Sequence, residues 1–580
     1  MNDAPFNHSH FIGYINHVSP QFVKLHFPSS VLMKSFSFYG EELKGGLVGS
    51  YVVIEGEKYG FLGKISEISL PEKERLELSE KSFNTKEFHP SGKIEVLMSF
   101  DLFNPYEINK GLNSLPLIGA KVFICSSKFI SNYFKAFGVK PEHKNSAPII
   151  KLGKLTYDNA TTIELSQQAL FSRHCAIVGT TGGGKSYTVS KLIEGIINNK
   201  GKAIIIDPTG EYSTYDEKDE VEKTILINDS YFSYKNLTIG DFFVLFKPSG
   251  QVQQPILLEA IKSLKISHCL KRDKDKYEPI EEGNKLTLTI GRKQLIIENG
   301  CIIKKNNEIK PFLNAHHIYK SEIESSDNSE FDITKLHHQI INECFQIDGD
   351  KWRNFRDDRN FGNSTSLLMR INNIIGDEDH KKMFGFDNNN ENDLISIIEN
   401  FLKNDSKNIL RIGFENIPYN FQVREILANS IGKYLLNMSR RGEFKNKPLI
   451  LFVDEAHQFL NKKVKDEYFE STELNSYDMI AKESRKYGLF LCLATQMPRD
   501  IPNGTLSQIG TFISHRLINH QDKEAVSNAC SSANRETLAF LPILGSGEAI
   551  LMGVDFPMPV MFKVDLPMIE PDSKTPLFSN

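Results

Sequence analysis

Residues 179–186 have the types and the spacing that hold a phosphate group. They read Gly-Thr-Thr-Gly-Gly-Gly-Lys-Ser, which fits the pattern G-x-x-x-x-G-K-S, and they follow the apolar stretch 174–178. Glycines let the backbone turn its N–H groups inward, and the start of a following helix adds unpaired donors and a positive dipole end. We therefore expect Lys185 to reach the β- and γ-phosphates of a nucleoside triphosphate, and the Ser186 hydroxyl to bind Mg²⁺.

The alternative interpretation of residues 179–186 is a glycine-rich surface turn. The patterns on either side, a strand before and a helix after, argue against it. The apolar stretch is typical of a strand, and after Lys185 the apolar positions recur at helical spacing. The expected ATP-binding residues are Gly179, Thr180, Thr181, Gly182, Gly183, Gly184, Lys185, Ser186 and Tyr187.

Two acids end a second apolar stretch, 449–455. Because parallel strands bring their carboxyl ends to one edge of a sheet, we expect these acids beside the phosphate loop. Asp454 would then hold the water shell of Mg²⁺, and Glu455 would polarise the water that attacks the γ-phosphate. A next strand, 489–495, delivers Gln496 to the same edge, where it could sense the γ-phosphate. The alternatives are a solvated strand end for the acids and a backbone-bonded amide for Gln496.

The elements around these residues predict a mostly parallel α/β sheet covered on both faces. Near-continuous apolar strands alternate with helical patterns from about residue 151, and this alternation is interrupted between roughly 240 and 405 by charged stretches and helical patterns. In residues 1 to about 150, short apolar stretches separated by glycine and proline predict a small β-barrel or sandwich. The expected domains are 1–150 (β-barrel), 151–240 (first part of the ATPase core), 241–405 (largely helical insertion), 406–565 (second part of the core) and 566–580 (tail).

Bulk properties exclude several classes of protein. The net charge of −4 is not typical of a nucleic-acid-binding protein, so any contact with DNA must be confined to a small part of the surface, such as a loop or the lining of a pore. The seven cysteines are scattered without a C-x-x-C pair, which argues against a disulfide framework or a zinc site. No apolar run approaches the length of a membrane span, and the first residues lack the pattern of a secretory signal. We expect a cytoplasmic protein that does not bind or cross a membrane.

Several segments together resemble the HerA family of hexameric, ATP-driven DNA translocases, in the HerA/FtsK group. The likeness extends from about 150 to 565, apart from the insertion. It rests on the phosphate loop, 206–212 (Ile-Asp-Pro-Thr-Gly-Glu-Tyr), 453–457 (Val-Asp-Glu-Ala-His), 483–488 (Glu-Ser-Arg-Lys-Tyr-Gly), 494–496 (Ala-Thr-Gln) and 515–517 (His-Arg-Leu). The D-x-x-G-E-Y segment discriminates best, because the phosphate loop alone would fit many ATPases.

This resemblance implies a RecA-like P-loop NTPase core, a six-membered ring and ATP sites at subunit boundaries. By its position Arg516 matches the family's arginine finger that acts on a neighbouring subunit, and Arg173 matches a second arginine expected to act within the site. Arg485 lies in the R-K-Y-G segment with a less defined role. For each of the three, a surface or structural salt bridge is the alternative. The tail is expected to pack onto a neighbouring subunit.

The resemblance also implies partners. Double-stranded DNA would pass through the ring, and the amino-terminal barrel would bind an effector, either a NurA-type nuclease or a sirtuin-like NAD hydrolase. We therefore expect an ATP- and Mg²⁺-dependent DNA translocase or helicase that works with such an effector, in anti-phage defence or DNA end processing. Two alternatives are a nucleotide-gated scaffold that activates a partner with little translocation, and a motor for protein or pilus export.

Overall fold

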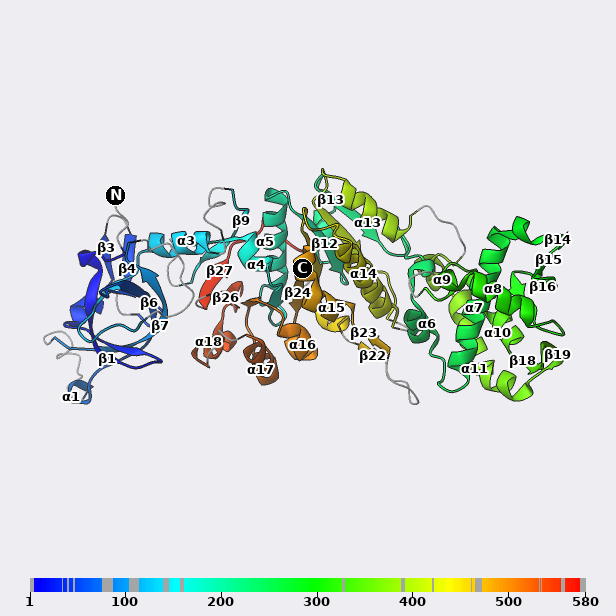
Figure 1. Cartoon of the computed structure of the whole chain (residues 1–580). Helices are drawn as coiled ribbons and strands as arrows, with labels where there is room; N and C mark the ends of the chain where they lie inside the picture. The colour runs from blue at the N-terminus through cyan, green and yellow to red at the C-terminus, as the bar shows by residue number, and fades with distance from the viewer. Residues whose placement is uncertain are drawn as a thin grey trace, which may run out of the picture.

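The structure is a computed structural model of the whole chain, shown in Figure 1. It describes residues 5–573 except 34, 39–40, 45–46, 76–86, 104–113, 138, 140–145, 157–160, 326–328, 387–391, 420–421, 461, 465–471, 531–532, 534, 554–555 and 557–558.

The amino-terminal region folds as a closed barrel with the strand order β1-β2-β7-β6-β5-β8. All its neighbours are antiparallel, and apolar side chains fill the interior because they alternate with exposed ones along the strands. Its strands are β1 (Phe11–Val18), β2 (Val23–His26), β5 (Tyr51–Ile54), β6 (Tyr59–Ser69), β7 (Ser91–Asp101) and β8 (Lys121–Ile124). The hairpin β3 (Ser35–Phe38) and β4 (Glu41–Lys44) and the short helix α1 (Glu72–Arg75) complete it.

The central region is built on an 11-stranded sheet in the order β10-β9-β27-β26-β25-β11-β24-β21-β12-β20-β13. The strands from β25 to β13 in this order run parallel, and the first four strands and β25 pair antiparallel. The bounds are β9 (Ile149–Leu155), β10 (Thr162–Ser166), β11 (Cys175–Val178), β12 (Lys202–Asp207), β13 (Val221–Ile225), β20 (Ile409–Gly413), β21 (Leu449–Val453), β24 (Leu489–Thr495), β25 (Thr511–Ser514), β26 (Glu548–Gly553) and β27 (Val560–Val564).

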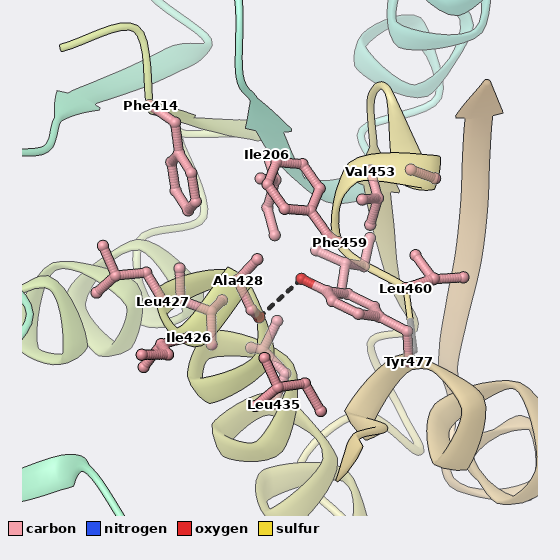
Figure 2. Packing of buried hydrophobic residues seen from close by; sticks show 14 of the residues in the cluster. Ile206, Phe414, Ile426, Leu427, Ala428, Leu435, Val453, Phe459, Leu460 and Tyr477 are labelled. Atoms are coloured by element: carbon pink, nitrogen blue, oxygen red, sulfur yellow. Dashed lines mark hydrogen bonds between the residues drawn. The ribbon is translucent and has the colours of Figure 1, made fainter. Parts of the chain in front are cut away.

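Both faces of this sheet are covered, because alternate residues of each strand point to opposite sides. Ala203 and Ile205 pack in one hydrophobic cluster with helix α5 (Lys185–Asn198), whereas Ile204 and Ile206 pack in another with α14 (Val423–Arg440). Figure 2 shows the second cluster, in which the Tyr477 hydroxyl donates a hydrogen bond to the carbonyl of Ala428 over 2.8 Å. The other helices of this region are α3 (Ser127–Ala136), α4 (Gln167–Phe171), α15 (Ser476–Glu483), α16 (Asn503–Leu506), α17 (His520–Ala529) and α18 (Arg535–Phe540), beside the hairpin β22 (Lys462–Val464) and β23 (Thr472–Leu474).

The segment between β13 and β20 leaves the sheet and forms the insertion. It carries a four-stranded antiparallel sheet and a separate hairpin among its helices. Its strands are β14 (Ile280–Glu282), β15 (Lys285–Ile290), β16 (Lys293–Glu298), β17 (Cys301–Ile302), β18 (Phe345–Asp348) and β19 (Lys351–Arg356). Its helices are α6 (Ile239–Phe246), α7 (Gln253–Arg272), α8 (Lys310–Ile318), α9 (Lys320–Ile323), α10 (Leu336–Glu343), α11 (Asp358–Gly376), α12 (Glu378–Phe384) and α13 (Leu394–Lys403).

The three regions form an elongated molecule, with the barrel and most of the insertion at opposite ends of the core (Figure 1). The barrel, the P-loop-type α/β core and the mainly helical insertion confirm the fold class predicted from the sequence. Within the described part of the chain, no helix combines the length and the apolar character needed to cross a membrane.

Candidate nucleotide site

The site lies at the carboxyl edge of the parallel strands, where segments distant in the sequence meet. β11 ends in the phosphate loop, β21 ends before Asp454 and Glu455, and β24 ends before Gln496. Since β24 lies between β11 and β21 in the sheet, these three strand ends are neighbours. The predicted juxtaposition of the phosphate loop and the two acids is therefore present in the structure.

The phosphate loop has a shape that only glycine allows at several positions. Gly182 and Gly184 have φ values of 71° and 116°, in the left-handed region. A Cβ on Gly179 would lie 2.6 Å from the Cβ of His515, so a larger residue there would displace the loop. Gly184 is the N-cap residue of α5, and no side chain accepts a hydrogen bond from the first N–H groups of the helix. These N–H groups are therefore available to bind a phosphate.

His515 forms the floor of this loop. It is completely buried, and its Nδ1 lies 2.8 Å from the carbonyl of Glu548, while its Nε2 lies 2.8 Å from the Thr188 hydroxyl on α5. A carbonyl only accepts, so Nδ1 carries the proton and Nε2 accepts from Thr188. Burial lowers the pKa of His515 to about 4, which keeps the ring neutral. The sequence reasoning missed this role, because only the packing of β25 against the loop discloses it.

Lys185, Glu455, Gln496 and Thr181 form one connected group. The Lys185 ammonium lies 3.5 Å from Glu455 Oε1, and both side chains are 7% exposed. Gln496 Nε2 donates to the same carboxylate over 2.7 Å, and the Thr181 hydroxyl donates to Gln496 Oε1 over 2.6 Å. The loop is thus joined to the acid at the end of β21 through the amide at the end of β24.

The backbone at Glu455 is unusual, since its φ of 43° is in the left-handed region. This conformation costs free energy for a residue with a Cβ, and such residues gather at functional sites. Burial raises the pKa of Glu455, but the contact with His457 Nδ1 at 3.2 Å, the charge of Lys185 and the hydrogen bond from Gln496 outweigh it and lower the pKa. The carboxylate therefore stays ionised and able to accept a proton.

Asp454 lies deeper, at 4% exposure, and its Oδ2 has no hydrogen-bond partner. Burial, followed by the nearby charges of Glu211 and Glu455, raises its pKa well above the ordinary range. A buried carboxylate oxygen without a donor is costly, so this atom is suited to a cation.

Glu211 is a further acid of the pocket to which the sequence reasoning gave no role. Burial raises the pKa of its carboxyl group, while the nearby Ser186 hydroxyl and the charge of Lys185 oppose that shift. The available signal was the D-x-x-G-E-Y segment, which follows β12 and therefore ends at the same sheet edge.

Arg516 and Tyr187 lie beside the loop of their own chain. The Arg516 carbonyl accepts hydrogen bonds from the Thr180 N–H over 3.0 Å and the Thr180 hydroxyl over 3.2 Å. Arg516 Nε is buried without a hydrogen-bond partner. The Tyr187 hydroxyl, on α5, donates to Glu570 over 3.3 Å. The described part of the tail thus packs on its own chain, and residues 574–580 lie outside the described residues.

Arg173 is not brought to this pocket within the chain. It precedes β11, whose opposite end carries the phosphate loop, so it lies at the amino edge of the sheet. Its carbonyl accepts a hydrogen bond from the Gly510 N–H over 2.6 Å. Arg485 precedes β24 at the same edge, and its charge contributes to lowering the pKa of His174. The expectation that Arg173 acts within the site of its own chain is therefore not supported by this geometry, because a strand separates it from the loop.

Comparison with known proteins identifies the family. The family model "Helicase HerA, central domain" matches residues 150–410, and "Helicase HerA-like C-terminal" matches residues 434–576. The chain is 25% identical to a probable DNA double-strand break repair helicase HerA of Methanocaldococcus jannaschii, covering 78% of this chain and 82% of that protein. It is 24% identical to the DNA double-strand break repair helicase HerA of Sulfurisphaera tokodaii, covering 89% and 88%.

Among solved structures, VirB4 of Thermoanaerobacter pseudethanolicus is similar with a TM-score of 0.46 and 13% identity, covering 73% of this chain and 97% of that one. The plasmid coupling protein TrwB in complex with ADP and Mg²⁺ has a TM-score of 0.41 and 13% identity, covering 70% and 88%. From the two family models and the HerA relatives, the chain belongs to the HerA family of helicases and is an ATP-hydrolysing P-loop enzyme.

Proposed function

We propose that this chain assembles into a six-membered ring that moves double-stranded DNA at the cost of ATP. The observation that carries the proposal is the connected group of Lys185, Glu455, Gln496 and Thr181, which links the phosphate loop to the water-activating acid. Relatives named as DNA double-strand break repair helicases support DNA as the substrate.

In this proposal the pocket residues divide the work on ATP. Lys185 binds the β- and γ-phosphates, and Glu455 orients the attacking water and takes its proton. Gln496 contacts both Glu455 and the loop residue Thr181, so it is suited to report whether a γ-phosphate is present. The contact of Lys185 with Glu455 must give way to the phosphate, which couples ATP binding to the release of the acid.

The residues present fit a Mg²⁺ ion. Ser186 and Asp454 offer oxygen ligands, which Mg²⁺ prefers, and the unpartnered Oδ2 of Asp454 is a buried acceptor that a cation would satisfy. Within the described part of the chain, no group of three or more His, Cys, Asp or Glu side chains forms a preassembled metal site. This agrees with an ion that takes its other ligands from phosphate and water. Bound Mg²⁺ would neutralise charge on the β- and γ-phosphate oxygens.

The arginines are proposed to act on both sides of a subunit boundary. Arg516 lies beside its own phosphate loop, which favours a role in the pocket of its own chain rather than the neighbour's pocket. Arg173 and Arg485 lie at the amino edge, which favours their presentation to the pocket of an adjoining copy. A guanidinium there would complete the charge compensation of the transferring phosphoryl group.

The amino-terminal barrel is the proposed docking site for an effector, a nuclease or an NAD hydrolase, in defence or DNA end processing. The barrel lies at the end of the core away from the insertion (Figure 1).

The direct test measures ATP turnover of the full-length protein with and without duplex DNA, and displacement of a protein roadblock from the duplex. A translocase is expected to show DNA-stimulated turnover and displacement, both absent in Lys185→Ala. Mass photometry is expected to show six copies. Nucleotide binding without DNA stimulation or displacement would instead support the scaffold hypothesis.

A further inference from the structure

The loop that follows β12 is held in one shape by a buried acid. Asp207 is completely buried; its Oδ1 accepts the N–H of Gly210 over 2.8 Å, and its Oδ2 accepts the N–H of Tyr212 over 3.0 Å. Gly210 has a φ of 80°, which favours glycine. Tyr212 is completely buried, so the loop is anchored on both sides of Glu211.

Asp207 is itself fixed by Arg411 on β20. Arg411 Nε donates to Asp207 Oδ2 over 2.8 Å, and both side chains are completely buried. The two other nitrogens of the guanidinium donate to Asp216 over 3.2 Å and to Glu415 over 2.9 Å. Such a network leaves Asp207 little freedom, because each of its carboxylate oxygens already has defined donors.

From this loop Glu211 reaches the pocket. Its carboxylate lies near the Ser186 hydroxyl and the Lys185 ammonium, both of which lower its pKa, while its carbonyl accepts the Asp572 N–H of the tail over 2.8 Å. Its carboxylate therefore lies near the hydroxyl that is proposed to bind Mg²⁺, while its backbone is held by the tail.

The pocket also holds an excess of acid. Glu211, Asp454 and Glu455 lie around one ammonium, that of Lys185. Asp454 is 4% exposed, and its Oδ2 is without a hydrogen-bond partner. A triphosphate adds further negative charge, so these carboxylates tolerate the nucleotide only with a cation that they help to hold.

We propose that Glu211 is a third Mg²⁺-site residue beside Ser186 and Asp454, and that Asp207 with Arg411 positions it. This inference rests on the proposed use of Mg²⁺ with ATP. Glu211 holds the ion, either directly or through its water shell, and keeps the Ser186 hydroxyl turned towards it. Glu211 thus ties metal occupancy to the loop after β12.

The test measures binding of a fluorescent ADP to full-length Glu211→Gln in EDTA and across a Mg²⁺ titration. In EDTA the variant is expected to bind at least as tightly as the unaltered protein, because a negative charge next to the phosphates is gone. The Mg²⁺ concentration for half-maximal tightening is expected to rise roughly 10- to 100-fold, the usual range for a residue that supports a metal ligand. Mn²⁺ binding followed by electron paramagnetic resonance gives the same comparison without turnover.

Glu217→Gln is the matched control, since Glu217 is an exposed acid shortly after the same loop. It is expected to keep the unaltered Mg²⁺ dependence. Glu211→Asp retains the charge and is expected to recover part of the metal affinity. An unchanged Mg²⁺ dependence in Glu211→Gln would overturn the proposal, and so would an equal loss of affinity with and without metal, which indicates a structural role.

Lys185→Ala and Asp454→Asn separate this inference from the proposed function. If Lys185→Ala binds ADP normally, the nucleotide site itself is wrong. If Lys185→Ala fails and Asp454→Asn loses Mg²⁺ dependence while Glu211→Gln keeps it, only the role of Glu211 is wrong.

Discussion

The two edges of the parallel sheet differ in charge. The carboxyl edge gathers Glu211, Asp454 and Glu455 around Lys185, in a mostly buried pocket. The amino edge presents Arg173 and Arg485 instead. Near the start of β12 lies a cavity of about 270 Å³ whose charged lining is mainly basic, with Lys202, Lys403, Arg441 and Lys447 against Glu399 and Glu443.

This difference supports the proposed ring, in which an adjoining copy would complete the pocket. Adding a triphosphate to an acidic pocket calls for cations, and each copy carries arginines at the edge that its own pocket does not reach. A head-to-tail contact would bring the amino edge of one copy to the carboxyl edge of the next, and such a heterologous contact forms a ring when the rotation between copies closes. The predictions below test the two edges separately.

Lys185→Ala is expected to have the largest effect, because it removes the ammonium from the acidic edge. Leaving buried carboxylates without their cation costs several kcal/mol, so nucleotide affinity should fall at least about 100-fold. Isothermal titration calorimetry checks this loss. Lys191→Ala is the control, since Lys191 lies on the same helix and pairs with Glu194 over 3.1 Å. Normal affinity in Lys185→Ala would contradict the site.

Glu455→Gln is expected to stop turnover while ATP remains bound. The amide keeps the shape but cannot take a proton from water, which lowers the rate roughly 100-fold or more. Single-turnover hydrolysis and filter binding measured on the same preparation separate the two quantities. Turnover at the unaltered rate would show that another group activates the water.

The amino edge is tested by mixing subunits. Arg173→Ala or Arg485→Ala chains combined with Lys185→Ala chains are expected to regain part of the ATPase activity, because some boundaries then pair an intact pocket with intact arginines. Arg516→Ala chains in the same mixture should not regain it if Arg516 serves its own pocket. Rescue with Arg516→Ala and none with Arg173→Ala would restore the assignment made from the sequence. Pulse ATPase assays over a range of mixing ratios provide the measurement.

The difference between the edges also explains what the sequence could predict. The spacing of Gly179 to Ser186, and the acids at the end of an apolar strand, place Lys185 and Asp454 at one edge by the geometry of parallel strands alone. The α/β class followed from the alternation of strands and helices, whereas the RecA-like core was implied by the resemblance to the HerA family. Roles that depend on the spatial order of strands could not be predicted in this way, and Arg173 shows the consequence: its sequence distance to the loop is short, but a strand lies between them.

Glu211 and His515 were missed for a related reason. The side chain of His515 reaches the loop only because β25 lies beside β11 in the sheet, although 300 residues and more separate them in the chain. Glu211 needed the turn set by Asp207 and Arg411, which are 204 positions apart. No periodicity in the sequence encodes such a meeting, whereas the phosphate loop is encoded by consecutive residues.

His515→Ala is expected to weaken nucleotide binding about tenfold, because Thr188 and the carbonyl of Glu548 lose their partner beneath the loop. His515→Gln, which offers one donor and one acceptor, should recover part of the affinity, and Thr188→Val should lose a similar amount. The shift in melting temperature caused by nucleotide is the decisive readout. A purely structural role would lower the melting temperature with and without nucleotide and leave that shift unchanged.

The smallest expected effect is a pH dependence of stability at the same residue. The pKa of His515 is about 4 in the folded chain, below its ordinary value near 6.5. As pH falls through 6.5 the unfolded chain takes up a proton first, so the stability is complete above about pH 7.5 and declines towards pH 4. Between pH 8 and 6 this amounts to about 1 kcal/mol of the free energy of unfolding. Urea denaturation of His515→Gln should show a loss smaller by this amount over the same range. An identical loss in both proteins would mean that the folded and unfolded chains protonate His515 with the same pKa.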